Sequence, residues 1–465
     1  MHLTSYILKT ALLLAAAASA EIAQAAVSIY GNAPSYAGKT LSLRTYSDQI
    51  MMDEEELGQA EVQSNGDFKF ELVSAETQQV FIPLPTSRGF IYIEPDGNYE
   101  ITLPEYSERT IQQKLSPFFA PKDFLLGIKN MDRGDLNFQM MEFDDGFDFY
   151  SMKHITYGSQ PDSLKKSIGQ MRSIFSDLKK PFQIRFKEYR YILLENMGAT
   201  TTQLQDTVIM HLNKMGADTY NPAFWDALNN IFSDFVQRSR DTEDFEILKR
   251  IINVCDAHML MEMLKERYKI TDTTLRNLAA IKILADLANN TEFDKQKTIA
   301  LQIAMRTQIS DTEDRNILEA CIQRSCLGYI GTPAVDFDCT TPSGKTIRLS
   351  ELQGKYVYLN FGNSNLEKTT RDIQVLQRFA DSFKNQLVVL NIFLYDTAEQ
   401  VKKIESQNKG KMMFATVKNS DLIKQYYGIK AVPDYAILDK EGKYLMTKGS
   451  EPNDELRLFL QNMLK

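Results

Sequence analysis

The 465-residue sequence has little of several features that mark particular classes of protein. Four cysteines are too few for a disulfide scaffold at this length, and no apolar run reaches the ~18 residues that a membrane-spanning helix needs. The net charge is −8, so no basic excess exists to hold nucleic acid or anionic lipid. What remains is 43% hydrophobic and 25% charged, which indicates a folded protein of several domains and no nucleic-acid partner.

Histidine is also scarce, and its positions suggest no catalytic or metal site. His154, His211 and His258 are scattered, without a nearby nucleophile pattern. Cys255 and His258 have the i, i+3 spacing of two metal ligands on a helix, but no second pair accompanies them. We therefore expect no metal and no cofactor.

The first 25 residues have the pattern of a cleavable signal peptide. Lys9 precedes a short apolar core, and small residues suited to cleavage follow at Ala18–Ala20 and Ala23–Ala25. No cysteine follows the core, so a lipoprotein is not expected. We predict export to a bacterial periplasm with no membrane segment after cleavage; the alternative is a buried N-terminal helix.

Residues 27–104 are predicted to form an antiparallel β sandwich or open barrel. Alternating apolar residues such as Leu41 and Leu43 are separated by turn formers such as Asn65-Gly66. The acidic run Asp53–Glu56 is interpreted as a solvated loop of this domain. The segment resembles a small β domain of unknown function that precedes thioredoxin-like domains in exported bacterial proteins. The resemblance rests on motifs at Gly31–Lys39, Asn65–Phe70 and Glu94–Ile101.

Residues 105–328 change to helical periodicity and predict a helical middle domain. Trp225, the only tryptophan, is expected to pack at a helix start rather than bind a ligand. One helix is expected around Leu164–Phe175 after Asp162 as N-cap, and another around Phe182–Leu193. Further helices are predicted at 223–239, 244–268, 273–287, 293–308 and 311–327.

Residues 331–465 alternate strands with helices and predict a sheet covered on both faces. Tyr356–Phe361 and Leu387–Leu394 are expected as strands, with helices at Thr370–Lys384 and Ala398–Gln407 between and after them. The whole chain is thus expected to be a multi-domain α+β protein with an α/β domain at its C-terminus.

This last domain is similar to the TlpA-like thioredoxin-like family of thiol-disulfide oxidoreductases. The similarity rests on four motifs in the family's order: Gly331–Phe337, Ser343–Lys355, Tyr427–Pro433 and Asp439–Lys443. The third motif implies a cis-proline at Pro433.

The chain departs from the family at the catalytic position. Where the family reads W-x-x-W-C-x-x-C, this chain has Leu366 and Thr369 in place of the two cysteines, and Gly362 and Asn365 in place of the tryptophans. Thiol-disulfide exchange needs a thiolate and a second thiol to resolve the mixed disulfide. We therefore predict that the domain has lost the redox activity that the resemblance implies.

The four cysteines elsewhere do not replace this pair in the prediction. Cys339 continues an alternation of apolar residues and is expected in the core. Cys321 and Cys326 lie about 140° apart around a predicted helix and cannot face one target together. A structural disulfide of Cys255 with Cys321 or Cys326 is favoured over catalysis.

The resemblance leaves one surface that could still act, the groove beside the cis-proline. Val432, Pro433 and Asp434 are candidate peptide-binding residues. The opposite wall is expected to come from the degenerate active-site loop, Asn363, Ser364, Asn365, Leu366, Glu367, Lys368 and Thr369.

Three functions are considered for this domain. We predict that it binds a polypeptide by strand addition without reacting with it, in envelope-protein handling. Alternatively, the groove is vestigial and the domain is architectural. The third candidate is an oxidoreductase or peroxidase that uses a non-standard cysteine.

Overall fold

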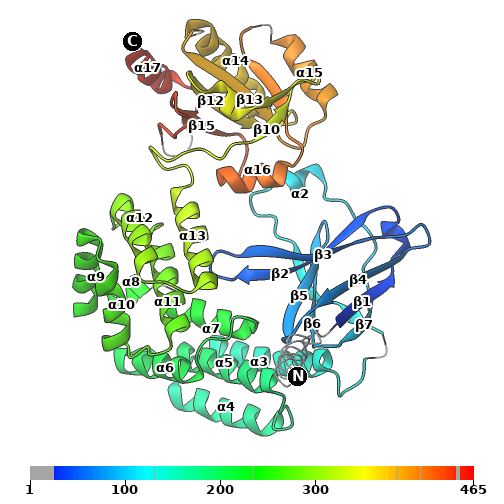
Figure 1. Ribbon diagram of the computed structural model, residues 1–465, viewed down its shortest axis with the longest axis vertical. Coiled ribbons are helices and arrows are strands. Elements are labelled where there is room, and N and C mark those ends of the chain that lie inside the picture. Colours follow the sequence, from blue (N-terminus) through cyan, green and yellow to red (C-terminus); the bar gives the residue numbers. More distant parts are fainter. Residues whose placement is uncertain are drawn as a thin grey trace, which may run out of the picture. The chain divides into compact units, whose positions relative to one another are not determined.

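The computed structural model describes residues 26–464 apart from 130, 234, 384, 409 and 447–450. The predicted signal peptide lies outside the described residues. The chain forms two compact units: the first contains residues up to 108 and 120–318, and the second contains 109–119 and 319–465 (Figure 1). Each unit is described separately below.

The first unit begins with a β sandwich whose sheets have the strand orders β4-β1-β7-β9 and β3-β2-β5-β6-β8. Alternating side chains such as Ile29, Leu43 and Phe70 fill the space between the sheets, as the sequence predicts. Two pairs, β1 with β7 and β6 with β8, are parallel, so the sandwich is not purely antiparallel. The predicted boundary at residue 104 leaves out β8 and β9, which complete the two sheets. The strands are β1 (Ala26–Asn32), β2 (Thr40–Asp48), β3 (Asp53–Glu61), β4 (Asp67–Val73), β5 (Gln78–Pro83), β6 (Ser87–Ile93), β7 (Asn98–Thr102), β8 (Lys122–Leu125) and β9 (Gly127–Ile128).

The acidic run Asp53–Glu56 is a strand, so its interpretation as a loop is wrong. It forms the first half of β3 and pairs with β2, where Thr45 lies opposite Glu55. Arg44 forms ion pairs with Glu54 (2.8 Å) and Glu56 (3.7 Å). Like charges are tolerated here because their side chains face solvent and a cation lies opposite them on the neighbouring strand.

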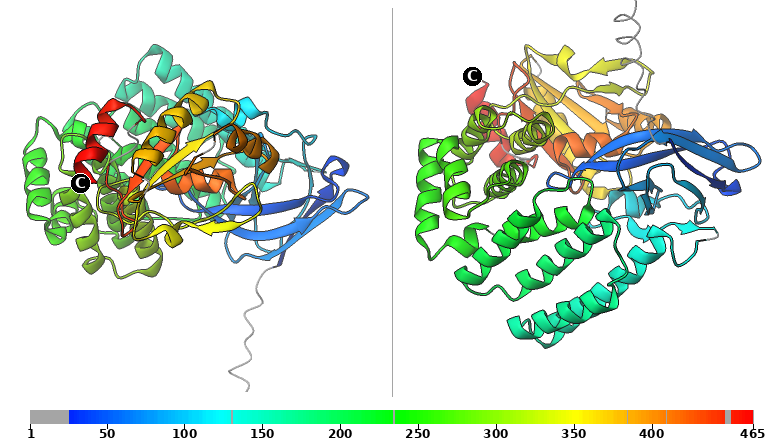
Figure 2. Two further views of the ribbon diagram at one scale, coloured as in Figure 1. Left: turned by 90° about the horizontal axis from the view of Figure 1, so that it is seen from above. Right: turned by 60° about the horizontal axis from the view of Figure 1, so that its bottom comes forward.

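The rest of the first unit is helical, and the helices gather beside the blue strands in Figure 2. The prediction of helices around Leu164–Phe175 and Phe182–Leu193 is confirmed, although Gln160, not Asp162, is the N-cap of the first. The predicted helix 223–239 is interrupted after Phe232, and 244–268 is interrupted at Cys255, whose φ is +53°. The helices are α3 (Leu136–Tyr157), α4 (Pro161–Ile174), α5 (Pro181–Met197), α6 (Thr202–Met215), α7 (Pro222–Phe232), α8 (Phe235–Ser239), α9 (Glu243–Val254), α10 (Ala257–Glu262), the π-helix Met263–Arg267, α11 (Thr273–Leu287), α12 (Lys295–Ala304) and α13 (Thr312–Cys326).

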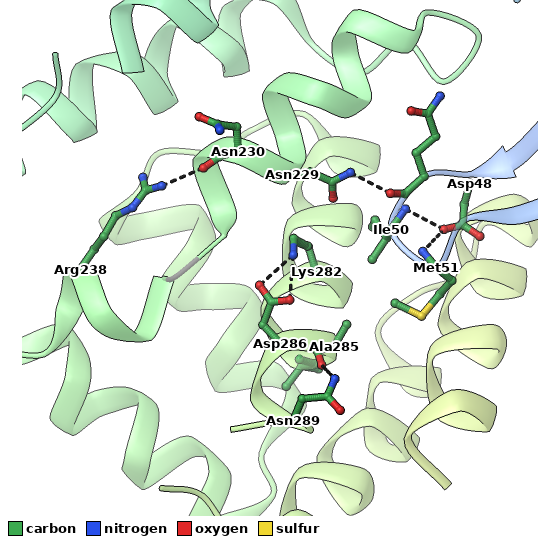
Figure 3. Close-up of polar contacts among 12 residues, drawn as sticks. Asp48, Ile50, Met51, Asn229, Asn230, Arg238, Lys282, Ala285, Asp286 and Asn289 are labelled. Carbon is green, nitrogen blue, oxygen red and sulfur yellow. Dashed lines mark hydrogen bonds and ion pairs between the residues drawn. The ribbon is translucent and has the colours of Figure 1, made fainter. Parts of the chain in front are cut away.

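Side-chain hydrogen bonds join these helices to the sandwich. The Asn137 side chain at the start of α3 accepts from Tyr92 N (2.7 Å) and donates to Tyr92 O (2.8 Å) on β6. At the tip of the β2–β3 hairpin, Asp48 accepts from Ile50 N, and Asn229 of α7 donates to Gln49 O at 2.7 Å (Figure 3). Because β2 and β6 both pair antiparallel with β5, Tyr92 and the hairpin tip lie toward the same end of the larger sheet, and this end is fixed to the helical layer.

Trp225 packs as the sequence predicts. It lies in the first turn of α7 after the N-cap Asn221, is 1% exposed, and donates from Nε1 to Thr219 O at 2.9 Å. Its ring contacts Phe224, so it belongs to the helical core.

The buried Asp314 of α13 should make the first unit more stable in mild acid. Its carboxylate accepts one hydrogen bond from Asn277 (2.8 Å), and burial raises its pKa to about 6. Because the folded pKa lies above the unfolded one, this contribution to stability is present below pH ~4 and is lost as the pH rises through 6. We expect Asp314→Asn to raise the free energy of unfolding at pH 7.5 by about 2 kcal/mol. Urea unfolding from pH 4.5 to 8 measures this, and a variant as pH-dependent as the parent would contradict it.

The second unit has a six-stranded sheet with the order β11-β10-β14-β13-β12-β15. Its three adjacent strands β12, β13 and β14 are parallel, and β15 runs antiparallel to β12. Leu359 and Tyr427 belong to the core on one face, and Tyr358 and Leu376 to the core on the other, so the prediction of a sheet covered on both faces is confirmed. The elements are β10 (Asp338–Thr340), β11 (Thr346–Arg348), β12 (Tyr356–Gly362), α14 (Glu367–Ser382), β13 (Leu387–Phe393), α15 (Ala398–Gln407), β14 (Met413–Thr416), α16 (Ser420–Tyr427), β15 (Asp434–Leu438) and α17 (Asp454–Met463).

A segment from the N-terminal half of the chain also belongs to this unit. Residues 109–119, which include the short helix α2 (Ile111–Leu115), pack on α16. Arg109 forms an ion pair with Asp421, and Lys424 Nζ donates to Lys114 O at 3.3 Å. No local sequence pattern predicts this contact, because it joins residues about 310 positions apart.

Candidate functional site

The candidate site lies where β12 and β13 end and α14 begins. Parallel strands end at the same edge of a sheet, so the loop after Gly362 and the loop after Phe393 lie side by side. Gly362 closely approaches Thr369, because a Cβ built on it would lie 2.5 Å from the Thr369 methyl group. This is the edge at which ligands bind in open α/β sheets.

The buried side chain of Asn363 holds the loop in place through hydrogen bonds to Leu394 and Asn365. Its side chain is fully buried, and its Nδ2 donates to Leu394 O at 2.6 Å. Its Oδ1 accepts from both the backbone N–H (3.0 Å) and the side chain (2.9 Å) of Asn365. The residue predicted as part of a peptide-binding wall is therefore an internal support, and Asn365 is the exposed neighbour that it positions.

Asp396 anchors the loop from the β13 side. Its carboxylate accepts from Ser364 N (2.9 Å) and from Ser364 Oγ. Burial raises the pKa of Asp396, and the two hydrogen bonds from Ser364 oppose this rise. Sequence reasoning missed Asp396; its position just after a predicted buried strand is the signal that could have found it.

Leu366 and Thr369 are the two residues that the sequence resemblance sets at the cysteine positions of the family. Leu366 is the N-cap of α14, and Thr369, 1% exposed, accepts from Asn363 N through Oγ1 at 3.3 Å. Neither side chain can form a thiolate or a disulfide. The first turn of the helix therefore offers a half-buried aliphatic group and a buried hydroxyl.

A second polar cluster lies along α14. Its side chains interact with one another, so they are not free to contact a ligand at the loop. Asp372 is buried and accepts from the Tyr435 hydroxyl at 2.6 Å. Burial and this hydrogen bond raise the pKa of Tyr435. Lys368 pairs with Asp372 (3.5 Å) and Glu451 (3.1 Å), so it is held by acids of its own domain. Glu367 is exposed.

The segment predicted to carry a cis-proline lies beside this loop. The peptide bond between Val432 and Pro433 is cis, and Asp434 lies opposite Phe361, two residues before Asn363. Val432, Pro433 and Asp434 are all half-buried. The N–H and C=O of Val432 have no hydrogen-bond partner within the part of the chain that the structure describes. The structure thus brings the two predicted segments together.

None of the four cysteines belongs to the loop 363–369 or to the segment 432–434. Cys339 is 1% exposed within the core, as predicted, and burial raises the pKa of its thiol to about 11. The predicted disulfide of Cys255 with Cys321 or Cys326 is wrong, because Cys255 is a free thiol. Cys255 ends α9, where its Sγ lies 3.4 Å from Ile252 O and 3.6 Å from Lys297 O, which directs the thiol between its own helix and α12.

The structure also pairs a histidine with a serine that sequence reasoning missed. His154 of α3 and Ser167 of α4 lie 3.0 Å apart between Nε2 and Oγ, but both are 2% exposed, so they join two helices rather than face a substrate.

Within the described ranges, no three His, Cys, Asp or Glu side chains are grouped so that they could hold a metal ion. No helix among those described has the length and apolarity to cross a membrane.

Comparison with known proteins finds that residues 330–444 match the model of the AhpC/TSA family. The thiol-disulfide oxidoreductase ResA of Bacillus thuringiensis subsp. konkukian is 27% identical over 136 residues, which are 29% of this chain and 78% of that protein. ResA of Bacillus anthracis is 26% identical over the same length. Two solved structures are similar to about 30% of the chain. They are the thioredoxin domain of a Bacteroides vulgatus thiol-disulfide oxidoreductase (19% identity, 99% of that chain, TM-score 0.28) and a Chlorobium tepidum DsbE-type interchange protein (23%, 99%, TM-score 0.26).

Proposed function

We propose, on the premise that residues 331–465 are a thioredoxin-like domain related to the thiol-disulfide oxidoreductases, that this domain binds extended polypeptides without exchanging disulfides. The observation that carries the proposal is the pairing of an unreactive helix start at Leu366 and Thr369 with an accessible backbone at Val432. The occupant would lie between these two segments.

The chemistry of the site supports binding rather than exchange. Exchange requires a thiolate that attacks one sulfur of a disulfide, and the first turn of α14 holds no sulfur atom. Cys339 is a poor substitute, since burial keeps its thiol protonated well above neutral pH. The alternative is an oxidoreductase or peroxidase that uses a non-standard cysteine such as Cys339.

The backbone at Val432 supports strand addition as the binding mode. An extended peptide that pairs with this N–H and C=O would gain main-chain hydrogen bonds without regard to its sequence. Exposed Asn365 would contact its side chains from the opposite wall, on a loop that Asn363 and Asp396 hold rigid. A preorganised loop reduces the entropy lost on binding.

The proposed location is the bacterial periplasm, after removal of residues 1–25. The signal-like pattern of these residues supports export, and the absence of a cysteine after the apolar core supports a protein without a lipid anchor. A peptide-binding domain in that compartment would act in envelope-protein handling.

Peptide binding is tested with reduced and alkylated peptides of about 12 residues, which cannot form disulfides. We expect the full mature chain to bind a subset of them in fluorescence anisotropy. Asn365→Trp should weaken binding at least tenfold by filling the groove, and Val432→Pro should do so by removing the backbone N–H. Lys403→Trp on the exposed face of α15 is the matched control and should bind as the parent does.

Two outcomes would contradict the proposal. One is unchanged binding in both groove variants, each shown by circular dichroism to be folded. The other is turnover of insulin disulfides by the parent chain that Cys339→Ser abolishes, which would support the enzymatic alternative.

A further inference from the structure

The outer face of the smaller sheet of the sandwich is concave. Outward-facing residues of β4, β1 and β7 form its floor, and Gln59 and Glu61 of β3 form one wall, because the chain turns from β3 directly into β4 at Asn65-Gly66. The resulting groove has a volume of about 840 Å³. This lies within the range of small-molecule sites in proteins, and nothing in the thioredoxin-like domain contributes to it.

An aromatic ring lies at the centre of the floor. Tyr30 is on β1, the middle strand of the three, between the buried Ile29 and Gly31, so its side chain points into the groove. The ring is half-buried, and its hydroxyl has no hydrogen-bond partner among the residues that the structure describes. It therefore offers a flat apolar surface with one free polar end.

Neutral amide side chains surround this ring. Asn32 lies on the same strand, Asn98 on β7, and Gln59 and Gln63 on the β3 side. Asn32 Nδ2 already donates to Asn65 O (3.0 Å) and Asp67 Oδ1 (2.7 Å), so Asn32 offers a ligand its carbonyl oxygen as an acceptor. Gln59 Nε2 donates to Glu56 Oε1 (2.7 Å), which leaves its carbonyl oxygen and one N–H for a ligand. Asn98 is exposed and has no hydrogen-bond partner within the described part of the chain, which leaves its whole side chain available.

The charged residues of the groove are mostly acidic: its lining holds Lys69 and the three carboxylates Glu61, Asp67 and Glu100. Lys69 is paired with Glu71 at 2.5 Å, and Glu100 is paired with Lys129. No cluster of cations is present among the lining residues, so the groove does not suit phosphate, nucleic acid or another strongly anionic ligand.

The floor also disfavours a peptide that adds as a strand. β1 is paired along its length with β4 on one side and, over Ser28–Gly31, with β7 on the other. Its backbone groups are therefore used within the sheet, and only side chains face the groove. This distinguishes the groove from the Val432 segment, where the backbone itself is available.

We propose that this groove binds a neutral oligosaccharide. A sugar ring has an apolar C–H face that can stack on Tyr30 and a rim of hydroxyl groups, each a donor and an acceptor, that can pair with Asn32, Gln59 and Asn98. The inference is independent of the peptide-binding proposal, since it concerns a different unit of the molecule.

The test is a panel of gluco-, manno-, xylo- and N-acetylglucosamine oligosaccharides of three to six units, presented on an array to the full mature chain. We expect at least one to bind, with calorimetry then giving its dissociation constant. Tyr30→Ala should weaken that binding at least tenfold and Asn98→Ala several-fold. Tyr157→Ala is the matched control, because Tyr157 is an exposed tyrosine on α3, outside the groove.

Asn98 is exposed, so its variant keeps the test valid even if Tyr30→Ala unfolds. Absence of binding across the panel at 10 mM sugar, or binding that neither variant weakens, would overturn the proposal. Binding of the alkylated peptides that is lost in Tyr30→Ala but kept in Asn365→Trp would also overturn it, by assigning the groove to a peptide.

Discussion

Introducing a cysteine pair, as Leu366→Cys with Thr369→Cys, should give the chain an insulin-reducing activity that we propose the parent lacks. The two positions are the N-cap and third residue of α14, the spacing of a C-x-x-C pair. Helix N-termini stabilise thiolates because their free N–H groups and macrodipole favour negative charge. The half-buried position 366 would supply the attacking thiolate, and the buried position 369 the resolving thiol.

The expected readout is insulin turbidity in the presence of dithiothreitol, at a rate at least tenfold above that of the parent. Each single variant is the control: Leu366→Cys alone should accumulate mixed disulfides, and Thr369→Cys alone should be inactive. Cys339→Ser should leave the rate of the double variant unchanged. An inactive but folded double variant would show that the loop, and not only the two side chains, has lost the catalytic geometry.

The sequence predicted the second unit well because its patterns are local. Strands β12 and β13 are apolar runs between turn residues, and the predicted helix Ala398–Gln407 agrees with α15 at both ends, where Thr397 forms a capping box. Helix α11 was also predicted with its observed bounds, since Asp272 caps it and its apolar face is broad. Such signals lie within a few residues of the element that they specify.

Elements whose outward face is charged or mixed were missed or misassigned. In α3, long aromatic residues such as Phe149 and Tyr157 are exposed while His154 is buried, so apolar character does not follow the buried face. In β3, the residues that pair with the acidic run lie on β2. The run Asp53–Glu56 itself contains no apolar residue that would indicate a strand.

Only those residues of the candidate site that belong to a sequence motif were predicted. The loop and the segment at Val432–Pro433 were identified, but the supports Asp396 and Asp372 were not, because each acts across elements that are brought together by the sheet. The disulfide prediction failed for a related reason. Cysteine spacing carries no information on where Cys255 directs its thiol, which the end of α9 decides.

Removing the half-buried Arg190 of α5 should cost the first unit about 1–3 kcal/mol of unfolding free energy. Its guanidinium pairs with Asp226 at 2.7 Å and Asp144 at 3.5 Å, and it lies 5.0 Å from the centre of the Phe186 ring. Arg190→Ala would leave the half-buried Asp144 without a cation. Arg240→Ala, which breaks an exposed pair with Glu292, should cost under about 1 kcal/mol in the same urea titration.

The pH dependence of this loss separates charge from packing. Burial raises the pKa of Asp144 to about 6 even beside Arg190, whose charge lowers it, so the pKa must rise further in Arg190→Ala. A carboxyl with a raised folded pKa loses its contribution to stability as the pH rises through that value, so the deficit of the variant should be larger at pH 8 than at pH 5. Arg190→Met with Asp144→Leu should recover most of it, because neither charge then remains buried. A deficit equal at both pH values would mean that the lost contacts with Phe186 and Phe147, rather than the uncompensated carboxylate, destabilise the fold.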